Sequence, residues 1–213
     1  MRMTLCAAAI ALTGAAAAEA RPVSYEGGWT AIQETDRQST AAWIHYTPHP
    51  KWSLGWRTEW DRQDDILFNG AQATYLARRW FGEDSQGNLY LFGGAGVAEG
   101  LDDNAAGAGA AGFAGLMADW ETRRWFVSYE ARYADFADAG DGAMQAARLG
   151  VAPYVADFGE LHTWLMVEID QRPENEEPVG VPPLVRFFKG PMLIELGYSV
   201  TDDEPLASFI YRF

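Results

Sequence analysis

Twelve ionisable residues of this 213-residue chain could form one polar network if the segments that carry them surround a common interior. They are His45, Arg57, Glu59, Glu130, Arg132, Arg148, His162, Glu168, Asp170, Arg186, Glu195 and Arg212. Arginines and carboxylates are equally numerous among them, so they could neutralise one another as buried ion pairs. They could also line a narrow polar pore for small solutes, or surround a ligand pocket or active site.

Nucleophilic catalysis is a weaker interpretation. Ser128 and His162 could both face the interior, but a Ser–His pair needs a third group to orient the histidine, and we find none. Lipases and lipid deacylases that act within membranes carry their catalytic groups on the lipid-facing surface, and not in an interior. We therefore expect no enzyme, and a lipid hydrolase is the least favoured alternative.

The sequence contains no motif that indicates a metal or cofactor site. His45, His49 and His162 do not have the H-x-x-x-H spacing of a metal site, and no thiolate or Met/His cluster favours a soft metal. Asp102, Asp103 and Asn104 resemble part of a calcium loop that lacks its glycine and its final glutamate. The glycine-rich run 93–115 matches no phosphate loop and is better explained by tight strand packing and a flexible hairpin. We expect no cofactor.

The elements that would position these residues are β-strands with two unlike faces. In the segment Lys51–Arg62, one side carries Trp52, Leu54, Trp56, Thr58 and Trp60, and the other carries Ser53, Gly55, Arg57, Glu59 and Asp61. This period of two is that of a strand. Tryptophans opposite charges indicate an apolar outside and a polar inside, which is the inverted arrangement of an outer-membrane barrel.

Other segments repeat the pattern. In 161–172 and 124–133, alternate positions are apolar, and the positions between them include Glu168, Asp170, Glu130 and Arg132. The segment Ile66–Trp80 alternates poorly, and its faces cannot be chosen from the sequence. The aromatic residues that we expect to contact the membrane are Trp52, Trp56, Trp60, Trp125, Tyr129, Phe209, Tyr211 and Phe213.

The first twenty residues have the features of a secretory signal peptide. Arg2 precedes an apolar stretch, and Ala18-Glu19-Ala20 fits the cleavage rule, so we expect one mature domain over residues 21–213. The single cysteine, Cys6, would be removed, which excludes disulfides and thiol catalysis. No later segment approaches the roughly 18 apolar residues of a membrane helix. A secreted chain that spans a membrane would then have to be a barrel.

We predict twelve strands in a closed antiparallel up-and-down barrel, with ten as the alternative count. The predicted ranges are 28–34, 39–47, 51–62, 66–80, 88–98, 109–120, 123–133, 143–156, 160–172, 179–188, 192–200 and 207–213. An even count places both chain ends at one, periplasmic, end of the barrel.

The net charge of −14 lies at the opposite end. The alternate connections 34–38, 61–65, 99–104, 134–142, 172–178 and 201–205 hold 17 acidic and three basic residues. One-sided acidity fits turns that share the extracellular side. Such acidity argues against nucleic acid as a partner. The acidic loops could collect divalent cations and bridge to the phosphates of lipopolysaccharide.

Several stretches resemble known outer-membrane proteins. The final F-I-Y-R-F resembles the signal that the barrel assembly machinery reads. S-Y-E-G-G-W-T, R-L-G-V-A-P-Y-V-A-D-F-G-E-L-H-T-W-L-M and P-P-L-V-R-F-F-K-G together resemble an uncharacterised family of proteobacterial outer-membrane β-barrels. The sequence as a whole predicts a monomer in the bacterial outer membrane, and the resemblance suggests a link to copper or heavy-metal handling genes.

The sequence therefore favours a structural outer-membrane barrel or a narrow channel for small solutes or ions. The competing class is a secreted, soluble β-barrel or sandwich that binds a ligand.

Overall fold

The computed structural model describes residues 22–101, 107–157, 159–175 and 178–213. The expected signal peptide with Cys6 lies outside these residues, and so do Asp102, Asp103 and Asn104. Among the described residues no helix is long and apolar enough to cross a membrane.

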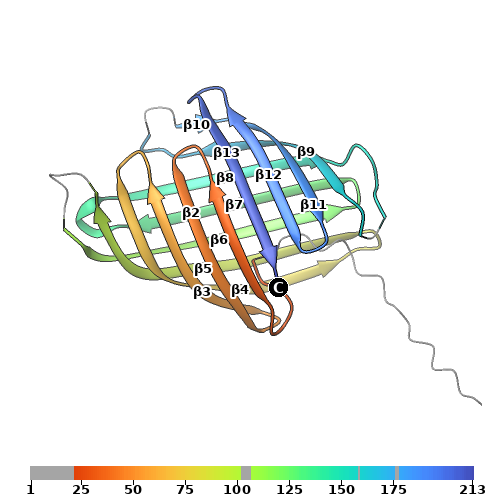
Figure 1. Ribbon diagram of the computed structural model, residues 1–213, viewed down its shortest axis with the longest axis horizontal. Coiled ribbons are helices and arrows are strands. Elements are labelled where there is room, and N and C mark those ends of the chain that lie inside the picture. Colours follow the sequence, from red (N-terminus) through yellow and green to blue (C-terminus); the bar gives the residue numbers. More distant parts are fainter. Residues whose placement is uncertain (1–21, 102–106, 158, 176–177) are drawn as a thin grey trace, which may run out of the picture.

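The described chain is built from β-strands joined in sequence (Figure 1). They are β1 (Trp29–Thr35), β2 (Ser39–His49), β3 (Trp52–Asp61), β4 (Ile66–Phe81), β5 (Ser85–Gly100), β6 (Gly109–Thr122), β7 (Trp125–Asp135), β8 (Asp141–Val151), β9 (His162–Gln171), β10 (Val179–Gly180), β11 (Pro183–Lys189), β12 (Met192–Ser199) and β13 (Glu204–Arg212). One 3-10 turn, η1 (Ala137–Ala139), lies between β7 and β8.

The sheet closes on itself because β1 pairs antiparallel with β13, for example Thr30 with Arg212, while β8 pairs with β9. The short β10 and β11 both pair with β9 in one continuous register. Pro182 and Pro183 interrupt this strand because proline has no N–H to donate, although the Pro182 carbonyl still accepts a hydrogen bond from the Glu168 N–H at 3.1 Å. Counting β10 and β11 as one, the barrel has twelve strands, which confirms the predicted fold.

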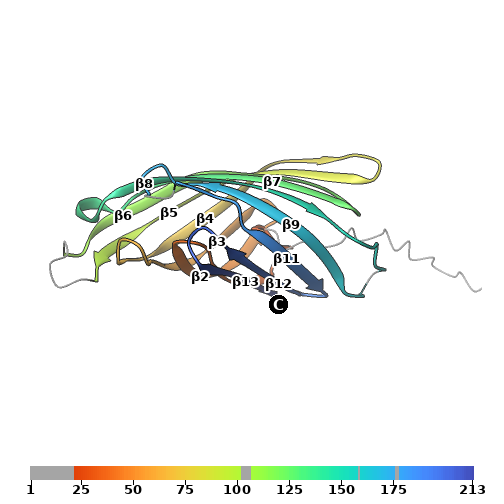
Figure 2. The same cartoon turned by 90° about the horizontal axis from the view of Figure 1, so that it is seen from above.

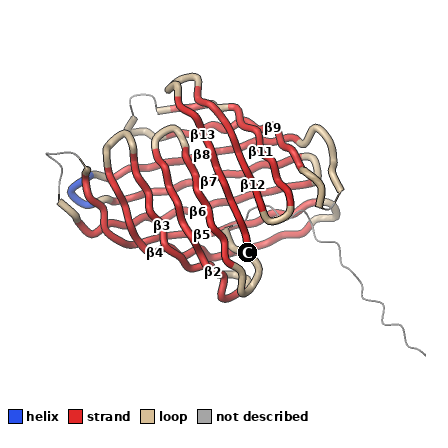
Figure 3. Tube along the Cα trace, viewed as in Figure 1, coloured by secondary structure: helices blue, strands red, loops and turns tan. Residues whose placement is uncertain are grey.

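The up-and-down order places the connections at two ends (Figures 1 and 3). The loop end carries the β1–β2, β3–β4, β5–β6, β7–β8, β9–β10 and β12–β13 connections. The terminal end carries the other connections and the start and end of the barrel, where Trp29 and Phe213 exchange backbone hydrogen bonds of 2.8 and 3.0 Å. The described parts of all six predicted acidic segments therefore lie at the loop end.

The poorly alternating segment contains a β-bulge. The pairing of β4 with β5 shifts between Leu76 and Arg78, so Ala77 is an extra residue on β4. Before the bulge the even residues Phe68 and Thr74 are buried, whereas beyond it Arg79 contacts the interior residue Asn88. A bulge exchanges the faces of a strand, which is why one parity could not describe the whole segment.

The two surfaces of the barrel are inverted relative to a soluble protein. Trp56 is 55% exposed in the middle of β3, whereas Glu59, three positions on and therefore on the opposite face of the strand, is 3% exposed. All eight aromatic residues that were expected to contact the membrane are exposed on the outside: Trp52, Trp56, Trp60, Trp125, Tyr129, Phe209, Tyr211 and Phe213. The long and strongly tilted strands of Figure 2 carry this pattern around the cylinder.

Exposed aromatic residues form a band near each end. At the terminal end, Trp52 packs on Tyr75 with ring centroids 4.5 Å apart, and Tyr211 stacks on Phe213 at 5.9 Å. At the loop end, the Trp60 indole N–H donates to Asp65 at 3.2 Å. Trp52 and Trp60 are about 26 Å apart along the strand at roughly 3.3 Å per residue, and a tilt of about 40° reduces the height to about 20 Å.

Small residues allow part of the wall to pack closely. A Cβ on Gly96 would lie 2.0 Å from the Asn69 carbonyl oxygen, and a Cβ on Gly94 would lie 2.5 Å from the Phe113 ring. Phe68 and Phe113 meet edge to face inside this wall, with centroids 5.6 Å apart. The glycine-rich run thus provides tight strand packing, as the sequence predicts; the middle of its hairpin lies in the segment that is not described.

Candidate functional site in the barrel lumen

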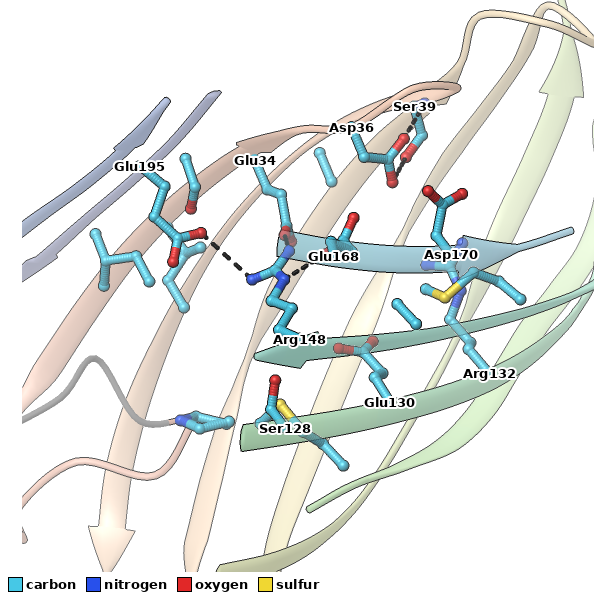
Figure 4. Close-up of a pocket in the computed structure, with 18 of the residues that line it drawn as sticks. Glu34, Asp36, Ser39, Ser128, Glu130, Arg132, Arg148, Glu168, Asp170 and Glu195 are labelled. Carbon is cyan, nitrogen blue, oxygen red and sulfur yellow. Dashed lines mark hydrogen bonds and ion pairs between the residues drawn. The ribbon is translucent and has the colours of Figure 1, made fainter. Parts of the chain in front are cut away.

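A cavity of about 200 Å³ lies inside the barrel (Figure 4). Its charged lining consists of the carboxylates Glu34, Asp36, Asp119, Glu130, Glu168, Asp170 and Glu195 and the arginines Arg37, Arg57, Arg132, Arg148, Arg172 and Arg186. These side chains come from strands on all sides of the cylinder because inward positions alternate along each strand. The lumen therefore contains a charged space large enough for several water molecules.

Arg148 is the centre of a network that crosses the lumen. From β8 its guanidinium reaches Glu195 on β12 at 3.3 Å and Glu34 on β1 at 3.5 Å, and its Nε donates to Glu168 on β9. Glu195 also accepts a hydrogen bond from Arg186. Figure 4 shows these carboxylates converging on Arg148. Arg148 thus connects opposite walls and narrows the passage between them.

A second cross-lumen pair surrounds Glu59. This carboxylate on β3 accepts hydrogen bonds from both terminal nitrogens of Arg132 on β7, at 2.7 and 2.5 Å, and from Arg57 Nε at 2.7 Å. The Arg57 guanidinium lies over the Trp43 ring at 4.5 Å, and both arginines lie 5.6 Å from the Phe113 ring. Bidentate pairing and ring contacts fix the orientation of both arginines.

Arg37 closes part of the loop end. It donates to Asp170 on β9 at 2.8 Å and to Asp202 in the β12–β13 connection at 2.7 Å. The hydrogen bonds to Asp202 raise the pKa of Arg37 well above its ordinary value. The Arg37 guanidinium in turn holds the pKa of the Asp202 carboxyl below its usual range. Arg37 thereby joins the β1–β2 connection, the end of β9 and the β12–β13 connection across the loop end of the lumen.

Asp36 forms the companion contact at this mouth. Burial acts to raise its pKa, but Arg172 at 2.6 Å and the backbone N–H groups of Ser39 and Gln38 outweigh burial, so the pKa of Asp36 lies below its ordinary value. Arg62 also donates to the Asp36 carbonyl at 2.8 Å. The loop end of the lumen is thus held by arginine–carboxylate contacts.

The terminal end is narrowed differently, by residues 22–28. Val23 is 3% exposed and packs against Leu76 and Tyr90 inside the barrel. The Pro22 carbonyl accepts a hydrogen bond from Ser53 at 2.8 Å, and Pro22 itself lines the cavity. The chain therefore enters the lumen before it joins β1.

Glu130 differs from the other carboxylates that line the cavity. It lies on β7 between Met117 and Ala146 of the neighbouring strands and points into the space below Arg148 (Figure 4). In the part of the chain that the structure describes, it forms no hydrogen bond or ion pair, whereas Asp119 accepts a hydrogen bond from Asn88 at 2.6 Å. Its carboxylate remains available to whatever fills the cavity.

Of the twelve residues that were expected in the lumen network, eight line the cavity and Glu59 lies directly behind it. The other three face inward away from the cavity. His45 is buried beside Thr30 and Arg212 in one row across β2, β1 and β13. The His162 ring packs near Phe188, with centroids 6.0 Å apart. Ser128 lines the cavity, and no contact joins it to His162.

Sequence reasoning missed Glu34, Asp36, Arg37, Asp119 and Arg172 as lining residues. Glu34 could have been found, because it has the inward parity of β1, and so could Asp119 on β6. The sequence predicts Asp36, Arg37 and Arg172 in solvated loops. Only the tertiary structure shows that these loops turn inward and line the loop end of the lumen. Among the described residues, no group of His, Cys, Asp or Glu has a geometry suited to a metal ion.

The sequence matches no protein-family model and no curated protein. The structure is similar to a KdgM porin, with a TM-score of 0.48 and 9% identity over 87% of this chain and 98% of that one. It is also similar to the beta domain of the Bordetella autotransporter BrkA, with a TM-score of 0.45, 13% identity and coverages of 87% and 97%. The outer membrane protein OprD of Pseudomonas aeruginosa gives a TM-score of 0.38, 10% identity and coverages of 89% and 66%.

Proposed function

We propose that this protein is an integral β-barrel of the bacterial outer membrane and a narrow channel for small solutes or ions. The observation that carries the proposal is the inversion of its surfaces, with exposed indoles such as Trp56 outside and ion pairs such as Glu59–Arg132 inside. In water the outer surface would be a far larger apolar patch than monomeric soluble proteins expose. In hydrocarbon it is covered by lipid, and closure leaves no unpaired strand edge.

Localisation and insertion can be tested together. The mature protein should fractionate with the outer membrane and should migrate faster in unboiled than in boiled gel samples. Recovery in the soluble periplasmic fraction, with no change of migration on boiling, would favour the alternative of a soluble ligand-binding barrel. Membership of a proteobacterial outer-membrane family is part of the proposal and has the same test.

Conduction is the decisive test of the channel. Purified protein inserted in a planar bilayer should give small, discrete current steps in potassium chloride. The second candidate is a structural barrel, which is favoured by the arginine network that crosses the lumen and leaves only about 200 Å³ of space. A fully inserted protein without current steps would support that structural function.

The partners follow from the same proposal. Lipids and lipopolysaccharide contact the apolar wall, the barrel assembly machinery engages the C-terminal strand, and the barrel is a monomer. The loop end can collect divalent cations as a solvated acidic rim. Titration with calcium, magnesium and copper while thermal stability is followed tests this; no shift with any ion would reject it. No described residues support a heavy-metal function.

A further inference from the structure

We propose that the lumen selects cations over anions and that Glu130 is the residue that determines this selectivity. The inference rests on the proposed channel function and names its substrate class. The supporting observation is that carboxylates neutralise every arginine that lines the cavity, whereas one lining carboxylate has no partner among the described residues.

The positive charges that line the cavity are all engaged. Each lining arginine forms an ion pair with at least one carboxylate: Arg37 with Asp170 and Asp202, Arg57 and Arg132 with Glu59, Arg148 with Glu34, Glu168 and Glu195, Arg172 with Asp36, and Arg186 with Glu195. Recognition of a passing anion requires free guanidinium donors. Both terminal nitrogens of Arg132 already donate to Glu59, so an anion would have to break a buried pair.

The negative charges are in excess. Seven carboxylates and six arginines line the cavity, and Glu59 and Asp202 neutralise arginines from outside the lining. Asp119 accepts a hydrogen bond from Asn88 at 2.6 Å, so Glu130 is the lining carboxylate for which the described residues provide no hydrogen bond or ion pair, and it points into the cavity (Figure 4). Fixed charges that line a narrow path select ions of the opposite sign, so a cation can pass Glu130 without disturbing any existing contact.

Location strengthens the effect of this one charge. Glu130 lies between Ser128 and Arg132 on β7, away from both mouths, where the walls exclude most of the solvent that would screen it. Glu99, by comparison, is exposed on the outward face of β5 at its loop end and does not line the cavity. Glu99 therefore serves as a control for Glu130, because it carries the same charge but lies outside the cavity.

The test measures reversal potentials of the full mature protein in a planar bilayer across a ten-fold gradient of potassium chloride. The wild-type protein should prefer potassium. Glu130→Gln should lower the ratio of cation to anion permeability about two-fold or more, which is the influence of one unit charge at roughly 10 Å in water. Glu99→Gln should leave the ratio unchanged. Heat-modifiable migration of each variant establishes that the barrel has formed.

The possible failures are distinct. Clear current steps with anion preference, or equal ratios for Glu130→Gln and Glu99→Gln, would reject the selectivity while the channel function stands. Absence of any current step in the wild-type protein would reject the channel function and the inference with it. A more severe variant, Glu130→Lys, should move the reversal potential further toward the anion side than Glu130→Gln, and a shift in the opposite direction would also contradict the proposal.

Discussion

The two ends of the lumen are narrowed by different chemistry. At the loop end, Arg37 and Arg172 join strand connections through carboxylates, so the constriction consists of charged groups. At the terminal end, Val23 fills an apolar niche formed with Leu76 and Tyr90, and backbone hydrogen bonds hold the segment that carries it. The first constriction depends on ionisation, whereas the second depends on burial of apolar surface.

The difference indicates which conditions should open each end. Ion pairs at a partly solvated mouth are weakened by acid and by salt. A buried valine is indifferent to both, but it is sensitive to loss of volume or of the segment itself.

Removal of the Glu59 carboxylate should have the largest effect on stability. Glu59→Ala leaves Arg57 and Arg132 buried without their shared partner, and breaking one side of a buried ion pair typically costs about 3–5 kcal/mol. Urea unfolding of the barrel in lipid, followed by tryptophan fluorescence, measures the loss. Glu99→Ala is the exposed control and should change stability by less than about 0.5 kcal/mol. Equal losses for both variants would show that the interior pairs contribute nothing specific.

Deletion of residues 22–26 should affect the terminal end alone. Loss of the buried Val23 side chain should cost about 1.5–3 kcal/mol, and the unitary conductance should rise because Pro22 no longer occupies the lumen. Bilayer recordings at neutral pH compare the deletion with the wild-type protein. An unchanged conductance would mean that residues 22–26 do not obstruct the path of ions through the lumen.

Acid should loosen the loop end. The pKa values of Asp36 and Asp202 are lowered in the folded state, so their contribution to stability is complete above the ordinary value of 3.8 and is lost as the pH falls through the folded values. Protease cleavage of the loop-end connections should therefore increase only below about pH 4, as measured with an acid-active protease. Asp202→Asn should show the increased cleavage already at neutral pH, and cleavage independent of pH would contradict the assignment.

The smallest effect is expected outside the lumen. Trp60→Phe keeps an aromatic ring in the loop-end band but removes the donor to Asp65, so the loss should be about 0.5–1.5 kcal/mol. The same urea titration measures it. Trp52→Phe, in the terminal-end band, removes no hydrogen bond to a carboxylate and should cost less; the reverse order would show that indole size, and not the hydrogen bond, determines the contribution.

Much of the fold could be read from alternation. The twelve strands, the outward tryptophans and the inward charges of β3, β7 and β9 follow from residue parity, because side chains of a strand must alternate between two faces. The β4 bulge could not be predicted in this way. The extra residue Ala77 exchanges the inward and outward positions of the strand, and an alanine gives no hydropathy signal that would mark the exchange. Parity also gave Glu130 its inward position but could not reveal that it lacks a partner.

The sequence by itself determined the wall of this protein: which side of each strand is apolar, how many strands there are, and at which end the acidic connections lie. These are local properties, since each depends on neighbouring residues along one strand or turn. Only the tertiary structure decided how charges combine, because Arg148 and its three carboxylate partners lie on four different strands. The distance across a closed barrel depends on register and closure together, and no single segment encodes either.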